Sequence, residues 1–229
     1  MAIPVMKFDL PSTPIRAVIF DLDGLLVNTE DLYEKSGNEL LGQYGHTMND
    51  NLREQIMGLT AQESLQTMID AFALDTTMEE LYVASEAIMR ELIANELEPM
   101  PGMLDLLATL KTGGFRRIVA TSGRRLYADE LLKTCNIAHH FEFVLTADDV
   151  QQAKPHPEIY HLAAQRLGLA PAATMVLEDS ANGVRAASAA GAYTVAVPNR
   201  HTASHSFEGA SLIADTLADP RILIALGLA

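Results

Sequence analysis

The chain has 229 residues, and 16 Lys and Arg against 30 Asp and Glu give it a net charge of −14. This length allows one domain, or one domain that carries an insertion. So acidic a chain disfavours nucleic acid and anionic membranes as partners, although a small anionic substrate can still bind where a metal sets the local field. Cys135 is the only cysteine, which excludes an internal disulfide and favours a reducing compartment.

The N-terminal segment, residues 1–14, lacks a basic region followed by an apolar core, and its prolines favour an extended arm. No stretch of about 18 apolar residues occurs that would predict a transmembrane helix. We therefore expect a cytoplasmic protein with no membrane partner. The sequence does not predict an oligomeric state.

Residues 16–20 form a short, largely apolar segment, typical of a parallel strand that is covered on both faces. Asp21 and Asp23 follow it, and residues two apart in an extended chain point to the same side. Two neighbouring carboxylates repel each other unless a cation lies between them, which favours Mg²⁺. Gly24 permits a turn after them. The alternative is an Asp-Gly turn that only ends a buried strand.

Apolar residues recur at helical spacing from Glu30 to about Asn95, with no convincing strand among them. Two connections interrupt the pattern, at 42–46 and 57–60, and Thr60 with Glu63 forms the signature of a helix N-terminus. The prolines of 97–102 then end the helical block. We predict a helical domain over residues 30–96, inserted into a core made of residues 1–29 and 97–229.

The rest of the chain alternates helices with short apolar strands. The predicted order is a helix at 103–111, a strand at 117–120, a helix at 124–135, a strand at 143–145, a helix at 158–167, a strand at 174–177, a helix at 182–190 and a strand at 193–197. This alternation predicts an α/β fold, a Rossmann-like doubly wound parallel sheet with helices on both faces.

Polar residues follow each of these strands, where open parallel sheets gather their reactive groups. Thr121 and Ser122 follow one strand, Lys154 lies in the loop after the next, and Glu178 with Asp179 follows a third. Each has a simpler explanation as a helix N-cap, a solvated lysine or acidic residues at a helix start. We favour a shared site because all of them follow strand ends.

These residue types suit attack on a phosphate monoester. Asp21 is the predicted nucleophile, forming an aspartyl phosphate, and Asp23 is the predicted acid and base for the leaving group and the attacking water. A carboxylate needs cations to approach a phosphate dianion, so we expect Mg²⁺ on Asp21, the main-chain carbonyl of Asp23 and Asp179, with Glu178 contributing. The predicted phosphate contacts are Gly24, Thr121, Ser122 and Lys154.

Four segments, in this order, resemble the four motifs of the haloacid dehalogenase superfamily. They are Asp21-Leu22-Asp23-Gly24, Thr121, Lys154-Pro155-His156-Pro157-Glu158 and Glu178-Asp179-Ser180. The helical insertion after the first motif resembles the cap of the branch that contains β-phosphoglucomutase, phosphoglycolate phosphatase and pseudouridine monophosphate phosphatase. The resemblance implies a Rossmann-like core, Mg²⁺, a phosphorylated Asp21 and a cap that closes over the substrate.

Within the superfamily, the aspartate at position 23 implies phosphate chemistry rather than dehalogenation. The resemblance places Tyr33 and Ala61 where the mutases have a histidine and an arginine that hold a distal phosphate, so we expect hydrolysis. Asn28 stands where the first motif usually continues to an acid. The predicted function is a Mg²⁺-dependent phosphatase of small phosphorylated metabolites, with sugar phosphates as the expected substrate class. A sugar-phosphate mutase and a non-catalytic phospho-acceptor module are the alternatives.

Overall fold

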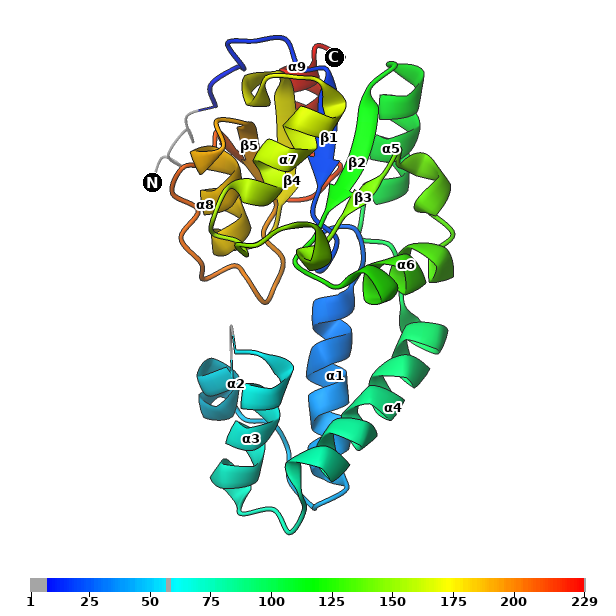
Figure 1. Cartoon of the computed structure of the whole chain (residues 1–229), viewed down its shortest axis with the longest axis vertical. Helices are drawn as coiled ribbons and strands as arrows, with labels where there is room; N and C mark the ends of the chain where they lie inside the picture. The colour runs from blue at the N-terminus through cyan, green and yellow to red at the C-terminus, as the bar shows by residue number, and fades with distance from the viewer. Residues whose placement is uncertain (1–7, 57–58, 229) are drawn as a thin grey trace, which may run out of the picture. The chain divides into compact units, whose positions relative to one another are not determined.

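The chain divides into two compact units, Met1–Asn28 with Glu98–Ala229, and Thr29–Leu97 (Figure 1). The computed structural model describes residues 8–56 and 59–228, without the side chains of residues 50 and 54. Half of the predicted N-terminal arm and the start of the predicted connection at 57–60 therefore lie outside the described residues. Among the described helices, none has the length and apolar character needed to cross a membrane.

Six parallel strands form the sheet of the first unit, in the order β3-β2-β1-β4-β5-β6. The strands are β1 (Ala17–Phe20), β2 (Arg116–Ala120), β3 (Val144–Leu145), β4 (Thr174–Glu178), β5 (Tyr193–Ala196) and β6 (Leu212–Ile213). In the centre, Ile19 pairs with Ile118 on one side and Val176 on the other. This sheet confirms the predicted doubly wound fold, and β6 is a strand that the sequence did not predict.

The helices of this unit follow the predicted alternation closely, within one or two residues at each end. They are α5 (Met103–Thr112), α6 (Arg125–Thr134), α7 (Glu158–Leu167), α8 (Ala181–Ala189) and an unpredicted α9 (Pro220–Leu226), with short 3₁₀ turns η1 (Ala138–His140), η2 (Ala147–Asp149) and η3 (Pro171–Ala173). Helices α7 and α8 pack on one face of the sheet, and α5 and α9 lie on the other (Figure 1).

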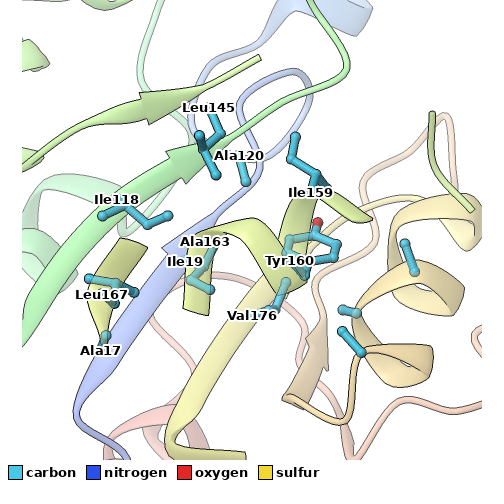
Figure 2. Packing of buried hydrophobic residues seen from close by; sticks show 13 residues of the cluster. Ala17, Ile19, Ile118, Ala120, Leu145, Ile159, Tyr160, Ala163, Leu167 and Val176 are labelled. Carbon is cyan, nitrogen blue, oxygen red and sulfur yellow. The ribbon is translucent and has the colours of Figure 1, made fainter. Parts of the chain in front are cut away.

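The core between α7, α8 and the sheet follows from the alternation of side chains along each strand. Ala17 and Ile19 of β1 join this cluster, in which Tyr160 is the largest side chain that is fully buried (Figure 2). Val18 and Phe20 are equally buried but point to the opposite face. Both faces of β1 are thus covered, which explains its unbroken apolar sequence.

The second unit contains four helices among its described residues, in the stretch where the sequence indicates helices. They are α1 (Thr29–Gly42), α2 (Asp50–Ile56), α3 (Ala61–Phe72) and α4 (Met78–Glu96). Thr60 and Thr77 begin α3 and α4 with complete capping boxes, of which the first was predicted. A separate apolar cluster holds these helices together, with Leu41 and Leu81 fully buried in it.

The two chain segments that lead into and out of the second unit pair with each other. Val27 and Pro99 form an isolated antiparallel bridge. The Asn28 N–H donates to the Glu98 carbonyl at 3.1 Å, and the Glu98 N–H donates to Asn28 Oδ1 at 2.8 Å. Asn28, which stands where the superfamily usually has an acid, therefore joins these two segments.

Candidate active site

The candidate site lies at the carboxyl ends of the central strands. Asp21 directly follows β1, Glu178 is the last residue of β4, and Asp179 comes next. All three are buried, and each offers one carboxylate oxygen so that these atoms lie within 4.8 Å of one another. The parallel pairing of Phe20 with Leu177 carries the two strands to this edge together, so segments more than a hundred residues apart supply one cluster.

Lys154 connects two of these carboxylates. Its Nζ lies 2.6 Å from Asp21 Oδ1 and 2.6 Å from Glu178 Oε1, and it donates to the Ala120 carbonyl at 2.9 Å. The lysine side chain is only 5% exposed, so the simpler explanation of a solvated loop lysine does not hold. The ammonium uses its three donors on three acceptors.

Burial and charge together shift the pKa values in this cluster. Burial raises the pKa of Asp21 to about 8, with the Glu178 and Asp23 charges adding to the effect and Lys154 opposing it. Burial alone would lower the pKa of Lys154, but Asp21 and Glu178 raise it well above its usual value. Lys154 is therefore a fixed positive charge, and the cluster still carries more negative charge than one ammonium offsets.

The Asp23 carboxylate contacts two hydroxyl groups. Thr121 Oγ1 lies 3.2 Å from Asp23 Oδ2, and the Tyr127 hydroxyl lies 3.2 Å from Asp23 Oδ1. Thr121 also accepts from the Gly123 N–H at 2.9 Å. Thr121 therefore contacts the predicted acid, whereas the N-cap of α6 is Arg124. The simpler explanation of Thr121 as a helix N-cap does not hold.

Glu178 is fixed on both of its oxygens. The buried Tyr160 hydroxyl donates to Oε1 at 2.6 Å, and the Ser180 hydroxyl donates to Oε2 at 3.1 Å. A Cβ at Gly183 would lie 1.8 Å from Oε1, so only glycine leaves room for this carboxylate. Burial and the Glu178 charge raise the pKa of Tyr160 well above its usual value, which keeps its hydroxyl protonated as a donor.

Asn199, in the loop after β5, orients Asp179. Its Nδ2 donates to Asp179 Oδ2 at 2.8 Å and to the Gly24 carbonyl at 3.1 Å. Its Oδ1 accepts from the His201 N–H at 2.8 Å. The amide thereby ties the loop after β5 to the turn after Asp23.

The donor set suits a hard divalent cation. Three buried carboxylates offer oxygen ligands, the kind that Mg²⁺ prefers. Burial is the main cause of the raised pKa of Asp21, and a bound cation would favour its ionised form in addition to Lys154. The Asp23 side chain is not in this group of three, and the contact of its main-chain carbonyl with a metal stays a prediction.

Gly24 and Ser122, two of the predicted phosphate contacts, lie beside the carboxylate cluster. The Gly24 N–H donates to the Val27 carbonyl at 2.9 Å, and the residue has a φ of 71°, which favours glycine in this turn. Ser122 is exposed beside Thr121. Both residues lie next to the site, and their contact with substrate stays a prediction.

Sequence reasoning did not find Tyr127, Tyr160 or Asn199. The two tyrosines lie on helices, where their spacing indicates only amphipathic packing, and Asn199 lies in a loop of no regular pattern. One signal in the sequence could have indicated Tyr160, which lies six residues after Lys154. A helix that begins directly after the lysine loop has its first turn near the same edge of the sheet.

Known proteins agree with this geometry. A model of the haloacid dehalogenase-like hydrolase family matches residues 18–197. The phosphorylated carbohydrates phosphatase of Thermotoga maritima is 32% identical over 177 residues, which cover 77% of this chain and 82% of the relative. The fructose-1-phosphate phosphatase YqaB of Escherichia coli is 31% identical over 176 residues, which cover 76% of this chain and 92% of the relative.

Solved structures agree as well. A candidate β-phosphoglucomutase from Thermotoga maritima superposes with a TM-score of 0.83 at 27% identity, covering 94% of this chain and 100% of that one. CbbY from Rhodobacter sphaeroides, in complex with phosphate, superposes with a TM-score of 0.73 at 29% identity, covering 90% and 96% of the two chains. The family match spans both β1 and β5, and with it the clustered carboxylates and Lys154, so the chain belongs to the haloacid dehalogenase-like hydrolases and is an enzyme of that family.

Proposed function

We propose that this protein is a Mg²⁺-dependent phosphatase that hydrolyses small phosphorylated metabolites, with sugar phosphates as the substrate class. The observation that carries the proposal is the cluster of Asp21, Glu178 and Asp179 around the ammonium of Lys154. Such a cluster combines a buried carboxylate nucleophile with the cations that a phosphate dianion requires. The named activities of the two phosphatase relatives support the choice of phosphorylated carbohydrates.

In the proposed first step, a carboxylate oxygen of Asp21 attacks phosphorus as the bond from phosphorus to the ester oxygen breaks. Asp23 donates its proton to the departing oxygen, which leaves as an alcohol. Lys154 holds Asp21 in place and offsets negative charge. In the second step, Asp23 accepts a proton from water as the water attacks the aspartyl phosphate, which releases inorganic phosphate and restores Asp21.

Asp21, Asp179 and the main-chain carbonyl of Asp23 would hold Mg²⁺, with Glu178 acting directly or by hydrogen bonding. The bound ion supplies positive charge that offsets the charge of the phosphoryl oxygens. Uncatalysed hydrolysis of phosphate monoesters is among the slowest known reactions, with accelerations of up to ~10²¹ in enzymes, so several charges must act together.

Hydrolysis is favoured over the mutase reaction by the charge of the second unit. Lys35, Arg53 and Arg90 are the only Lys and Arg residues between 29 and 97. Lys35 pairs with Glu96, and Arg53 pairs with Glu34, so two of the three cations are already engaged within the unit. Retention of a bisphosphate intermediate, which a mutase needs, would require further positive charge.

A sugar-phosphate mutase is the second candidate, supported by the likeness to the Thermotoga candidate β-phosphoglucomutase. Incubation with β-glucose 1-phosphate and a bisphosphate primer separates the two, since a mutase yields glucose 6-phosphate and a phosphatase yields free phosphate. A phospho-acceptor module would instead retain its phosphate in a stable phosphorylated form.

A cytoplasmic location fits the single cysteine.

A panel of phosphorylated metabolites, assayed for phosphate release with Mg²⁺ and with a chelator, tests the proposed function. We expect release from sugar monophosphates that the chelator abolishes. Asp21→Asn removes the nucleophile with little change of shape, so it should be folded and inactive. Full activity of that variant would exclude Asp21 as the nucleophile.

A further inference from the structure

Asp23 is held by two hydroxyl groups, one on each carboxylate oxygen. Thr121 approaches Oδ2 and Tyr127 approaches Oδ1, both at 3.2 Å. The proposed function gives Thr121 a second task, because its hydroxyl is also the predicted contact of the phosphoryl oxygens. A bound phosphoryl group would share that hydroxyl with Asp23, so the Tyr127 hydroxyl is the donor to Asp23 for which no second task is predicted.

Tyr127 is well placed to fix the carboxylate because the start of α6 is itself anchored. The Arg125 N–H donates to Asp148 Oδ2 at 2.9 Å, and the Arg125 guanidinium donates to the Val144 carbonyl at 2.8 Å and to Asp149 Oδ2 at 2.9 Å. These bonds join the first turn of α6 to β3 and η2. The phenol therefore extends from a backbone that cannot shift without breaking several hydrogen bonds.

The loop before α6 also leaves room for this contact. A Cβ at Gly123 would lie 3.2 Å from Tyr127 Cδ1, 3.3 Å from Thr121 Oγ1 and 3.7 Å from Asp23 Oδ2. A side chain at that position would press on the phenol ring and the Thr121 hydroxyl at once. The absence of a side chain lets both donors approach Asp23 together.

From this geometry we infer that Tyr127 is a positioning residue for the proton transfers of Asp23, an inference that rests on the proposed function. Tyr127 keeps its own proton throughout. Asp23 gives its proton to the leaving oxygen as the ester bond breaks, and it takes one from water as the aspartyl phosphate is hydrolysed. The Tyr127 hydroxyl limits rotation of the Asp23 carboxylate in both steps, and a misplacement of about 1 Å can cost ~100-fold in rate.

The test compares two substrates with the variant Tyr127→Phe in the full-length enzyme with Mg²⁺. The sugar of a sugar phosphate departs through an ester oxygen that needs a proton, whereas 4-nitrophenyl phosphate releases a stable phenolate that needs none. We expect Tyr127→Phe to lower kcat/KM by ~10- to 100-fold for the sugar phosphate and to leave it nearly unchanged for the nitrophenyl ester. Since hydrolysis of the aspartyl phosphate still uses Asp23, the nitrophenyl ester should give a burst of nitrophenol followed by a slower steady rate.

Tyr193→Phe is the matched control, because it also removes a tyrosine hydroxyl that makes a hydrogen bond, to the Asp9 carbonyl at 2.8 Å. It should leave both substrates unaffected. An equal loss of kcat/KM on the two substrates, or no loss on the sugar phosphate, would overturn the role of Tyr127. A wild-type enzyme that releases phosphate from neither ester would instead overturn the proposed function, so the two failures are distinct.

Discussion

At the scale of single residues, Lys154 is the cation that offsets the charge of the buried carboxylates Asp21 and Glu178. Its ammonium is buried between Asp21 and Glu178, with side chains that are 10% and 1% exposed. Removing one partner of a buried ion pair leaves an uncompensated charge, which typically costs about 3–5 kcal/mol. The site therefore depends on this one residue for stability as well as for the proposed chemistry.

We predict that Lys154→Met lowers the free energy of unfolding by about 3–5 kcal/mol in metal-free buffer. Added Mg²⁺ should recover part of this loss, because a divalent cation offsets the same carboxylates. Urea unfolding with and without Mg²⁺ measures both effects. Lys111→Met removes an exposed lysine of α5 and should change little; equal losses in the two variants would contradict the prediction.

Asn199 provides a second prediction at this scale, through its bond to Asp179. Asn199→Ala should weaken Mg²⁺ binding by about 10- to 100-fold, as loss of a group that orients a metal ligand commonly does. Calorimetric titration of Mg²⁺ measures the affinity without reliance on turnover. Asn95→Ala, which removes an exposed amide of α4, is the control and should bind Mg²⁺ as the wild type does.

The motif residues were predictable from the sequence because each follows an apolar strand, and parallel strands end at the same edge of the sheet. Asp21, Lys154 and Asp179 meet at one edge for that reason. Tyr127 and Asn199 were not predictable, since their function depends on how α6 and the loop after β5 return to the edge. A tyrosine on an amphipathic helix has no feature that distinguishes a site contact from ordinary packing.

At the scale of elements, the strands and helices with strong apolar patterns were predicted almost to the residue, and α7 was predicted with its bounds over 158–167. The unpredicted elements are short. β6 has two residues and α9 has seven, which is too few to establish a period. The signals that α9 does carry are local ones, Asp219 as N-cap followed by Pro220 and a Gly227 with a φ of 71° at its end.

Asp219 gives α9 a stability that depends on pH. Hydrogen bonds from Arg221 hold the pKa of Asp219 below its usual value, although burial opposes the shift. A carboxyl whose pKa is lower in the folded state stabilises the fold above its unfolded pKa, and this contribution is lost as the pH falls through the folded pKa. Acidification below about pH 4 should therefore remove this contribution to the stability of the C-terminal helix.

We predict that Asp219→Asn, which keeps an N-cap acceptor, lowers the free energy of unfolding by about 1–2 kcal/mol at pH 7. The difference from the wild type should shrink as the pH falls below about 4, because the wild-type carboxyl is then protonated as well. Urea unfolding between pH 7 and pH 3 gives this difference. The exposed Asp105→Asn at the start of α5 serves as control, and a difference that stays constant with pH would contradict the ion-pair explanation.

At the scale of the whole molecule, each unit has an apolar cluster of its own among the described residues. The cluster around Leu81 involves only residues of α1–α4 and their connections, and the cluster around Ile19 involves only the sheet with its helices. The described members of these two clusters do not overlap. A destabilised core in one unit should therefore leave the other unit largely protected from local unfolding.

We predict that Leu81→Ala destabilises the second unit by about 2–5 kcal/mol. Amide hydrogen exchange should quicken in α1, α3 and α4 and stay at the wild-type rate in β1 and β4. Leu107→Ala, which truncates a fully buried leucine of α5, should show the reverse pattern. Exchange that quickens equally in both units would indicate a single cooperative core.

The paired segments at Asn28 and Glu98 have an evolutionary consequence. Because the polypeptide departs from the sheet and returns to it at hydrogen-bonded neighbours, the whole of α1–α4 occupies the topological position of a surface loop. Such a loop can be lengthened, rebuilt or exchanged while β1 and α5 keep their geometry. Such an arrangement allows the residues at the sheet edge to be inherited while the inserted helices diversify.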